Sequence, residues 1–303
     1  MSGTPRARAG VLCMLGATML WGGTFVVTRD ALAAIPPAGL IAGRFLTAGA
    51  LLAAVALAGR RRFGRDTWIA GLVSAPFVAA CYLLQATGLL ATSAGSSAFL
   101  TAAGTLTVAL FAWAGLGERP SRRVTAGIAL ALLGSALLSW RSGMRFGGAE
   151  LLTLAGATAY AVALVVVAAR IGRVDPVALT AVQTLAAAAC VLPFARGSAL
   201  AAAGLEGPDR LRFLYLALAG SSVAPLLQVF AQRALPAARI GILFALEPVF
   251  ALVFAVLFGA ERFAPRWWAG AGLILGAVVI VEGLASPAGP PSAGDSSARP
   301  ATT

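Results

Sequence analysis

Apolar segments of about 20 residues, the length that a helix needs to cross a bilayer, follow one another through almost the whole chain. Such a segment spans a hydrocarbon core about 30 Å thick. Hydrophobic residues make up 59% of the 303 residues and charged residues 11%, which is far from the composition of a soluble domain. The sequence therefore predicts an all-α integral membrane protein.

Turn residues and arginines divide the chain into ten such segments. The first five cover residues 11–29, 36–59, 67–90, 95–117 and 122–140. The second five cover residues 149–169, 176–195, 212–233, 237–259 and 265–284. We therefore expect two five-helix units, residues 11–140 and 147–284. A tail rich in Pro, Gly, Ser and Ala, residues 285–303, is expected to be disordered.

The two units share a repeated block. Gln85, preceded by two leucines, recurs 143 residues later as Gln228, and Glu118-Arg119 recurs at the same offset as Glu261-Arg262. Matches of Gln, Glu and Arg are hard to obtain by chance in a chain dominated by Ala and Leu, so we infer a duplication. Five spans per unit is an odd number, and the second unit must therefore enter the membrane from the opposite side. Inverted repeats of this kind are typical of secondary transporters, which bind substrate near the midplane between the halves.

The distribution of arginine predicts the orientation of the chain in the membrane. The net charge of +12 is carried by arginine alone, because the chain has no lysine. With the N-terminus inside, nearly all arginines of the first unit lie in the cytoplasm, including the cluster at Arg60, Arg61, Arg62 and Arg65. We expect both termini to be cytoplasmic. Cytoplasmic loops explain the positive charge of so hydrophobic a chain better than a nucleic-acid partner does.

Several short motifs resemble one family over residues 12–284. They are Trp21-Gly22-Gly23-Thr24-Phe25, Arg44, the Tyr82–Gln85 stretch, Leu246-Glu247-Pro248-Val249-Phe250 and the two Glu-Arg pairs. Together with ten spans and an inverted duplication, they make the chain similar to the drug/metabolite transporter superfamily, EamA type. The resemblance implies a ten-helix exporter of small metabolites in the bacterial cytoplasmic membrane. The family often has proline in the middle of helix 4, where this chain has Gly104-Thr105, so we expect that helix to be straighter than the helix with Glu247-Pro248.

Two charged residues lie deep within predicted spans. A charge at the centre of a spanning helix costs about 2.5–3.5 kcal/mol, so Arg44 and Glu247 should face the bundle interior or a wet cavity. In one interpretation, Glu247 binds a substrate amine or a proton and Arg44 binds a substrate carboxylate. In the other, the two neutralise each other, or Arg44 caps helix carbonyls. Pro248 frees a carbonyl on the preceding turn, which can bend the helix or line a cavity.

Other polar and aromatic residues are weaker candidates for the pathway. Trp21 lies mid-span, away from the interfacial belts, and either stacks on a substrate or packs against helices. Thr24 belongs to the same motif, and Tyr160 takes the corresponding place in the second unit. Gln85 and Gln228 are gate hydrogen bonds or, the interpretation we favour, interhelical contacts.

The two repeated glutamates have a plainer interpretation. Glu118 and Glu261 lie at helix ends, where pairing with the adjacent arginine or capping of the next helix is expected.

An enzyme is the competing class, and the sequence disfavours it. The chain has no histidine, no phosphate-binding loop and only one securely deep carboxylate. We expect no metal or other cofactor. The main prediction is an exporter of amino acids or related metabolites by alternating access, with protons as the candidate coupling ion. A multidrug efflux carrier is the alternative, followed by a non-transporting scaffold, and the protein can be a monomer or a homodimer.

Overall fold

The computed structural model describes residues 5–139, 147–257 and 265–283, and in these ranges the regular structure is helical, without a strand. The all-α prediction is confirmed. The helices of the first half are α1 (Pro5–Ala31), α2 (Pro37–Ala58), α3 (Arg65–Gly88), α4 (Ala94–Thr105), α5 (Val108–Leu116) and α6 (Arg122–Ser139). Those of the second half are α7 (Gly148–Ala168), η1 (Ile171–Arg173), α8 (Pro176–Ala195), η2 (Ser198–Gly204), α9 (Gly207–Tyr215), η3 (Leu216–Val223), α10 (Ala224–Gln232), α11 (Ala237–Phe244), α12 (Glu247–Leu257), α13 (Arg266–Val278) and η4 (Val279–Gly283).

Eight helical stretches of the described residues are long and apolar enough to cross a membrane. They correspond to eight of the ten predicted spans. The remaining two, residues 122–140 and 265–284, coincide with α6 and with α13 plus η4, which do not belong to that set. These stretches indicate a multi-pass membrane protein, and the number of ten spans stays a prediction. The predicted tail, residues 285–303, and the Glu261-Arg262 pair lie outside the described residues.

Short local signals start and stop these helices. Asp175 begins α8, because its side-chain oxygen accepts hydrogen bonds from the backbone N–H groups of Val177 and Ala178, both 3.0 Å away. Pro176 follows at the first helical position, where its missing N–H costs nothing. α5 ends at Gly117, whose φ of 71° is the left-handed conformation that glycine adopts freely.

The expectation of a straighter helix 4 is wrong. The predicted span 95–117 is divided between α4 and α5 at Leu106 and Thr107. Two threonine hydroxyls bond back to the helix: Thr105 donates to the carbonyls of residues 101 and 102, both at 3.0 Å, and Thr107 donates to the carbonyl of Gly104 at 2.5 Å. Threonine back-bonding of this kind bends helices. The span is thus interrupted at a position without proline, where threonine hydroxyls bond to the helix carbonyls.

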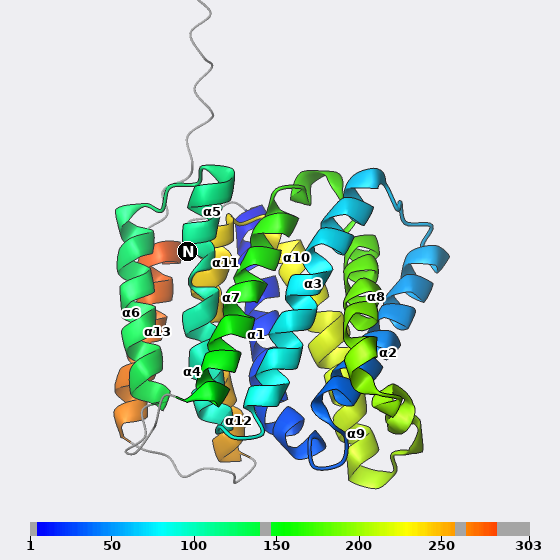
Figure 1. The fold of residues 1–303 in the computed structure, drawn as a ribbon. Coiled ribbons are helices and arrows are strands. Elements are labelled where there is room, and N and C mark those ends of the chain that lie inside the picture. Colours follow the sequence, from blue (N-terminus) through cyan, green and yellow to red (C-terminus); the bar gives the residue numbers. More distant parts are fainter. Residues whose placement is uncertain (1–4, 140–146, 258–264, 284–303) are drawn as a thin grey trace, which may run out of the picture.

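Two pairs of helices, with one helix from each half of the chain, lie side by side and run antiparallel. Figure 1 shows α6 beside α13 at one edge of the bundle and α2 beside α8 at the other. Gly39 of α2 lies against Ser198, just after α8, whereas Gly49 lies against Leu185 within α8. α6 approaches α13 so closely that a Cβ on Gly134 would lie 2.6 Å from the Gly270 carbonyl oxygen. Small residues permit such contacts between membrane helices.

The outer surface of the bundle is apolar, as contact with lipid requires. Leu12 on α1, Leu57 on α2 and Leu133 on α6 are all more than half exposed. In water this surface would be unfavourable, whereas lipid chains solvate it as well as protein does. The interior, by contrast, contains polar and charged side chains, among them Arg44, Gln228 and Glu247.

Candidate functional site

Glu247 lies at a break in a membrane helix. The predicted span 237–259 is divided into two helices: α11 ends at Phe244, and α12 begins at Glu247. Pro248 explains the break, because it has no N–H for the carbonyl of residue 244, yet it is tolerated in the first turn of α12. The carboxyl group thus lies at a helix N-terminus, the end at which the helix dipole favours negative charge.

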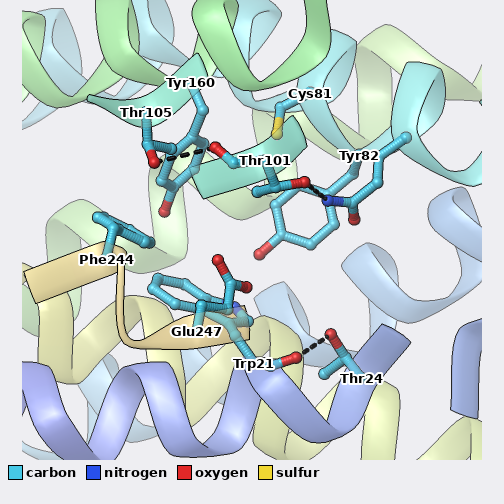
Figure 2. Close-up of a pocket in the computed structure, with 10 residues that line it drawn as sticks. Trp21, Thr24, Cys81, Tyr82, Thr101, Thr105, Tyr160, Phe244 and Glu247 are labelled. Carbon is cyan, nitrogen blue, oxygen red and sulfur yellow. Dashed lines mark hydrogen bonds between the residues drawn. The ribbon is translucent and has the colours of Figure 1, made fainter. Parts of the chain in front are cut away.

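The Glu247 side chain faces a small internal cavity of about 30 Å³ (Figure 2). A volume of that size is enough for water, since roughly 10–15 Å³ admits one molecule, but it is too small for a metabolite. The residues that line it come from α1, α3, α4, α7, α11 and α12: Trp21, Thr24, Cys81, Tyr82, Gln85, Thr101, Thr105, Tyr160, Phe244 and Glu247. Five of the residues that the sequence singled out, Trp21, Thr24, Gln85, Tyr160 and Glu247, therefore meet at one place.

Four of the ten residues that line the cavity are aromatic. The Trp21 ring is stacked on Phe244 with centroids 5.2 Å apart, and it meets Tyr160 edge-on at 6.1 Å. Tyr82 approaches Tyr160 edge-on at 6.4 Å. Glu247 is 4% exposed, and its Oε2 has no hydrogen-bond partner among the described residues. Among the described residues that line the cavity, the buried carboxyl group of Glu247 is the one acidic or basic side chain, and aromatic rings lie beside it.

The carbonyl oxygen of Gly220 fixes two of these rings. It accepts hydrogen bonds from Trp21 Nε1 at 2.9 Å and from the Tyr82 hydroxyl at 3.4 Å. Gly220 lies in η3, a π-helical segment in which a carbonyl normally pairs with the N–H five residues on. That residue is Pro225, which has no N–H, so the carbonyl is available to side chains. A π segment inside a helix often marks a functional site.

Arg44 lies one layer behind the cavity wall and does not line it. It is 2% exposed, its Nε donates to Ser221 Oγ at 2.7 Å, and its guanidinium lies 5.2 Å from the centroid of the Tyr82 ring. Its Nη2 is buried without a partner among the described residues. Neither an ion pair with Glu247 nor a hydrogen bond to a helix carbonyl occurs in the described part of the chain. Both structural interpretations of Arg44 therefore lack the contact that they require.

The two repeated glutamines make different contacts. Gln85 is half-buried and donates from Nε2 to the Thr101 hydroxyl at 2.8 Å, from α3 to α4. Gln228 is buried, accepts from the Tyr160 hydroxyl at 2.9 Å and donates to Gln232, whose Nε2 donates to the backbone of α7. Both glutamines are thus interhelical contacts in this structure, and Gln85 is also part of the cavity wall.

The remaining sequence candidates lie away from the cavity. Glu118 is exposed just beyond α5 and makes no ion pair within the described ranges, so the expected pairing with Arg119 is absent there. Sequence reasoning missed Phe244 and Gly220 altogether. The signal for Gly220 was available: it opens the run Gly220-Ser221-Ser222, three small residues inside an otherwise apolar span and three residues before a proline.

The fold and the cavity define a class of protein. A multi-pass helical bundle with a buried, unpartnered carboxyl group at a helix break is typical of membrane carriers, in which intramembrane charge and interrupted helices mark the pathway.

Comparisons with known proteins narrow the class. The profile of the EamA-like transporter family matches residues 8–140 and 147–282. An uncharacterized transporter of Archaeoglobus fulgidus is 27% identical over 264 residues, which cover 87% of this chain and 82% of the relative. A crystal structure with 22% sequence identity superposes with a TM-score of 0.74 over 91% of this chain and 97% of the other. The chain belongs to the EamA-like transporter family of the drug/metabolite transporter superfamily and is a membrane transporter, as the resemblance predicted.

Proposed function

We propose that the protein is a secondary transporter that exports amino acids or related small metabolites by alternating access. The observation that carries the proposal is the Glu247 carboxyl group, which is 4% exposed, has an oxygen without a partner and faces an aromatic cavity. An idle charge inside a membrane costs about 2.5–3.5 kcal/mol on insertion scales. A substrate ammonium group or a proton would supply the missing partner.

The site must enlarge before a substrate enters, because about 30 Å³ holds water and not an amino acid. Rocking of two five-helix halves about the cavity would provide the room. The antiparallel packing of α2 on α8 and of α6 on α13 supports such halves, since equivalent helices of inverted repeats run in opposite directions. On the arginine bias, we place both termini in the cytoplasm of a bacterial cell.

Proton exchange at Glu247 would couple the cycle. Burial in apolar surroundings disfavours the charged form of a carboxyl group. In the closed, dry cavity Glu247 would hold a proton, and on opening it would give up the proton and bind a cationic substrate group. Trp21 and Phe244, stacked 5.2 Å apart beside it, offer ring faces that also attract cations.

Arg44 would bind the anionic group of the substrate. Its free Nη2 lies behind Tyr82, so movement of that ring during opening would bring a carboxylate into reach. The alternative, efflux of lipophilic cations, has its own support: in this closed state the cavity wall is aromatic and carries no basic side chain. Transport of amino acids would require Arg44, whereas efflux of lipophilic cations would not.

Transport by purified protein in liposomes with an imposed pH gradient tests the role of Glu247. We expect Glu247→Gln to lose gradient-driven transport and to keep its folded structure. Glu118→Gln is the matched control, because it removes an exposed carboxyl group outside the cavity. A Glu247→Gln protein that transports as fast as wild type would refute the coupling role.

Substrate class and architecture need separate measurements. If amino acids are carried, Arg44→Gln should raise the KM for amino acids, whereas efflux of a lipophilic cation should be unaffected by this change. Single cysteines in the 118–123 and 261–266 stretches, labelled from outside, test the inversion. Labelling of both stretches from the same side would exclude it.

A further inference from the structure

An apolar hollow of about 450 Å³ opens on the outside of the bundle between α2 and α3. α8 packs along both helices and forms its floor. The lining residues are all apolar and include Leu57, Phe63, Trp68, Leu72, Val182 and Leu185. This volume lies within the roughly 300–1,000 Å³ of pockets that hold small ligands. In the membrane, the occupant of such a groove is a hydrocarbon chain.

A cluster of arginines lies in the turn at one end of the groove. Arg60, Arg61, Arg62 and Arg65 are all exposed, directly between Leu57 and Trp68 in the chain. Arg61 lies 3.6 Å from Asp175 at the start of α8. The other three make no ion pair in the part of the chain that the structure describes. Three uncompensated positive charges thus border an apolar groove.

The backbone holds these arginines in a fixed turn. α2 ends in a Schellman motif, in which the N–H of Arg60 bonds to the Leu57 carbonyl at 3.0 Å and the N–H of Arg61 bonds to the Ala56 carbonyl at 2.8 Å. Arg60 takes the left-handed position with φ of 50°, where glycine fits without strain. Trp68 and Phe63, with ring centroids 6.2 Å apart, lie at the same level. Tryptophan at this level is typical of the headgroup region.

We propose that this groove binds an anionic phospholipid. One acyl chain lies along the apolar wall formed by Leu57, Trp68 and Leu72, and the phosphate is bound by Arg60, Arg62 and Arg65. Guanidinium groups bind phosphate through two parallel hydrogen bonds, and basic pockets between membrane helices bind anionic headgroups. A second copy of the chain is a poorer occupant, because a symmetric contact on this face would bring two arginine clusters together.

Native mass spectrometry of the detergent-purified protein, with phosphatidylglycerol or phosphatidylcholine of equal chain length added, measures the headgroup preference. Each arginine near an anionic headgroup contributes about fivefold to binding. We therefore expect a clear preference for phosphatidylglycerol and a loss of roughly 25-fold in Arg60→Gln/Arg62→Gln. Arg119→Gln/Arg122→Gln removes equal charge from the α5–α6 turn and should keep the wild-type preference.

Quenching of tryptophan fluorescence by phosphatidylglycerol with brominated acyl chains locates the bound lipid. We expect the quenchable fraction to fall in Trp68→Phe, because Trp68 is about half exposed in the groove. Three results would each overturn the proposal. The first is equal binding of phosphatidylglycerol and phosphatidylcholine to the wild-type protein. The second is the same lipid preference in Arg60→Gln/Arg62→Gln as in Arg119→Gln/Arg122→Gln. The third is a dimer without bound lipid, in which quenching does not depend on Trp68.

Discussion

Gly220→Ala should destabilise the transporter through the contacts around the cavity. A Cβ at this position would lie 2.7 Å from Arg44 Nη2 and 2.8 Å from Thr24 Cγ2. Optimal contacts between carbon atoms are about 3.5–4.0 Å, so both neighbours must retreat by about 1 Å. Arg44 is 2% and Thr24 7% exposed, so both side chains must move within the packed interior.

The magnitude follows from three contributions. Overpacking a buried site costs about 1–3 kcal/mol, and moving the guanidinium weakens its bond to Ser221, a charge-assisted bond of about 1.5–3 kcal/mol. Alanine in place of glycine in a helix returns about 0.5–1 kcal/mol. We expect a net loss of roughly 2–4 kcal/mol in the free energy of unfolding.

Unfolding in mixed detergent micelles, followed by tryptophan fluorescence, measures this loss. Gly272→Ala is the matched control, since nothing lies within 4 Å of a Cβ there and stability should stay equal or rise. Shortening Arg44 to Leu should remove part of the clash, so the two changes together should cost less than their sum. If Gly220→Ala is as stable as wild type, or if the two changes add, the packing described around this glycine is wrong.

Three further substitutions test single contacts by the same unfolding measurement. Trp21→Phe removes the indole donor to the Gly220 carbonyl and should cost about 1–3 kcal/mol, so a loss below about 0.5 kcal/mol would contradict that bond. Tyr160→Phe leaves a buried amide oxygen without its donor and should cost a similar amount, about 1–3 kcal/mol. Arg239→Gln breaks the ion pair with Glu282, whose side chain is 10% exposed, and should destabilise equally at low and high salt because screening of buried pairs is weak.

Hydropathy predicted the helices well, because bilayer thickness sets their length. α8 begins and ends where the sequence indicated, residues 176–195, owing to its Asp175 cap and Pro176 start. The breaks inside the spans 95–117 and 237–259 were less accessible. Proline signals one of them, but the other has no proline and is accompanied by threonine hydroxyls, whose partners depend on the helices around them.

The sequence predicted only part of the candidate site, and the difference between the two parts has a physical reason. Glu247 was predictable because a deep charge is costly wherever it points. The position of Arg44 behind Tyr82 was not, because it depends on which face of α2 meets η3. The acceptor role of Gly220 was signalled only indirectly, by the run of small residues before Pro225, since a main-chain carbonyl has no signature of its own.

The repeat inferred from the sequence relates residues on different sides of the cavity. Thr101 and Phe244 are 143 residues apart and hence equivalent in the duplication, and both line the cavity. Three residues further along each copy, Gly104 is equivalent to Glu247, and only the second copy carries a charge.

The helix breaks differ between the copies as well. The break in the first copy is at Leu106, whereas the break in the second is at Ala245, equivalent to residue 102. They are thus about one turn apart, or roughly 6 Å at 1.5 Å per residue. In the second copy this shift puts Glu247 on a helix N-terminus, where the dipole favours its charged form, while burial favours the neutral form. We therefore infer that the two copies share the scaffold of the cavity and that they differ chemically at the position of Glu247.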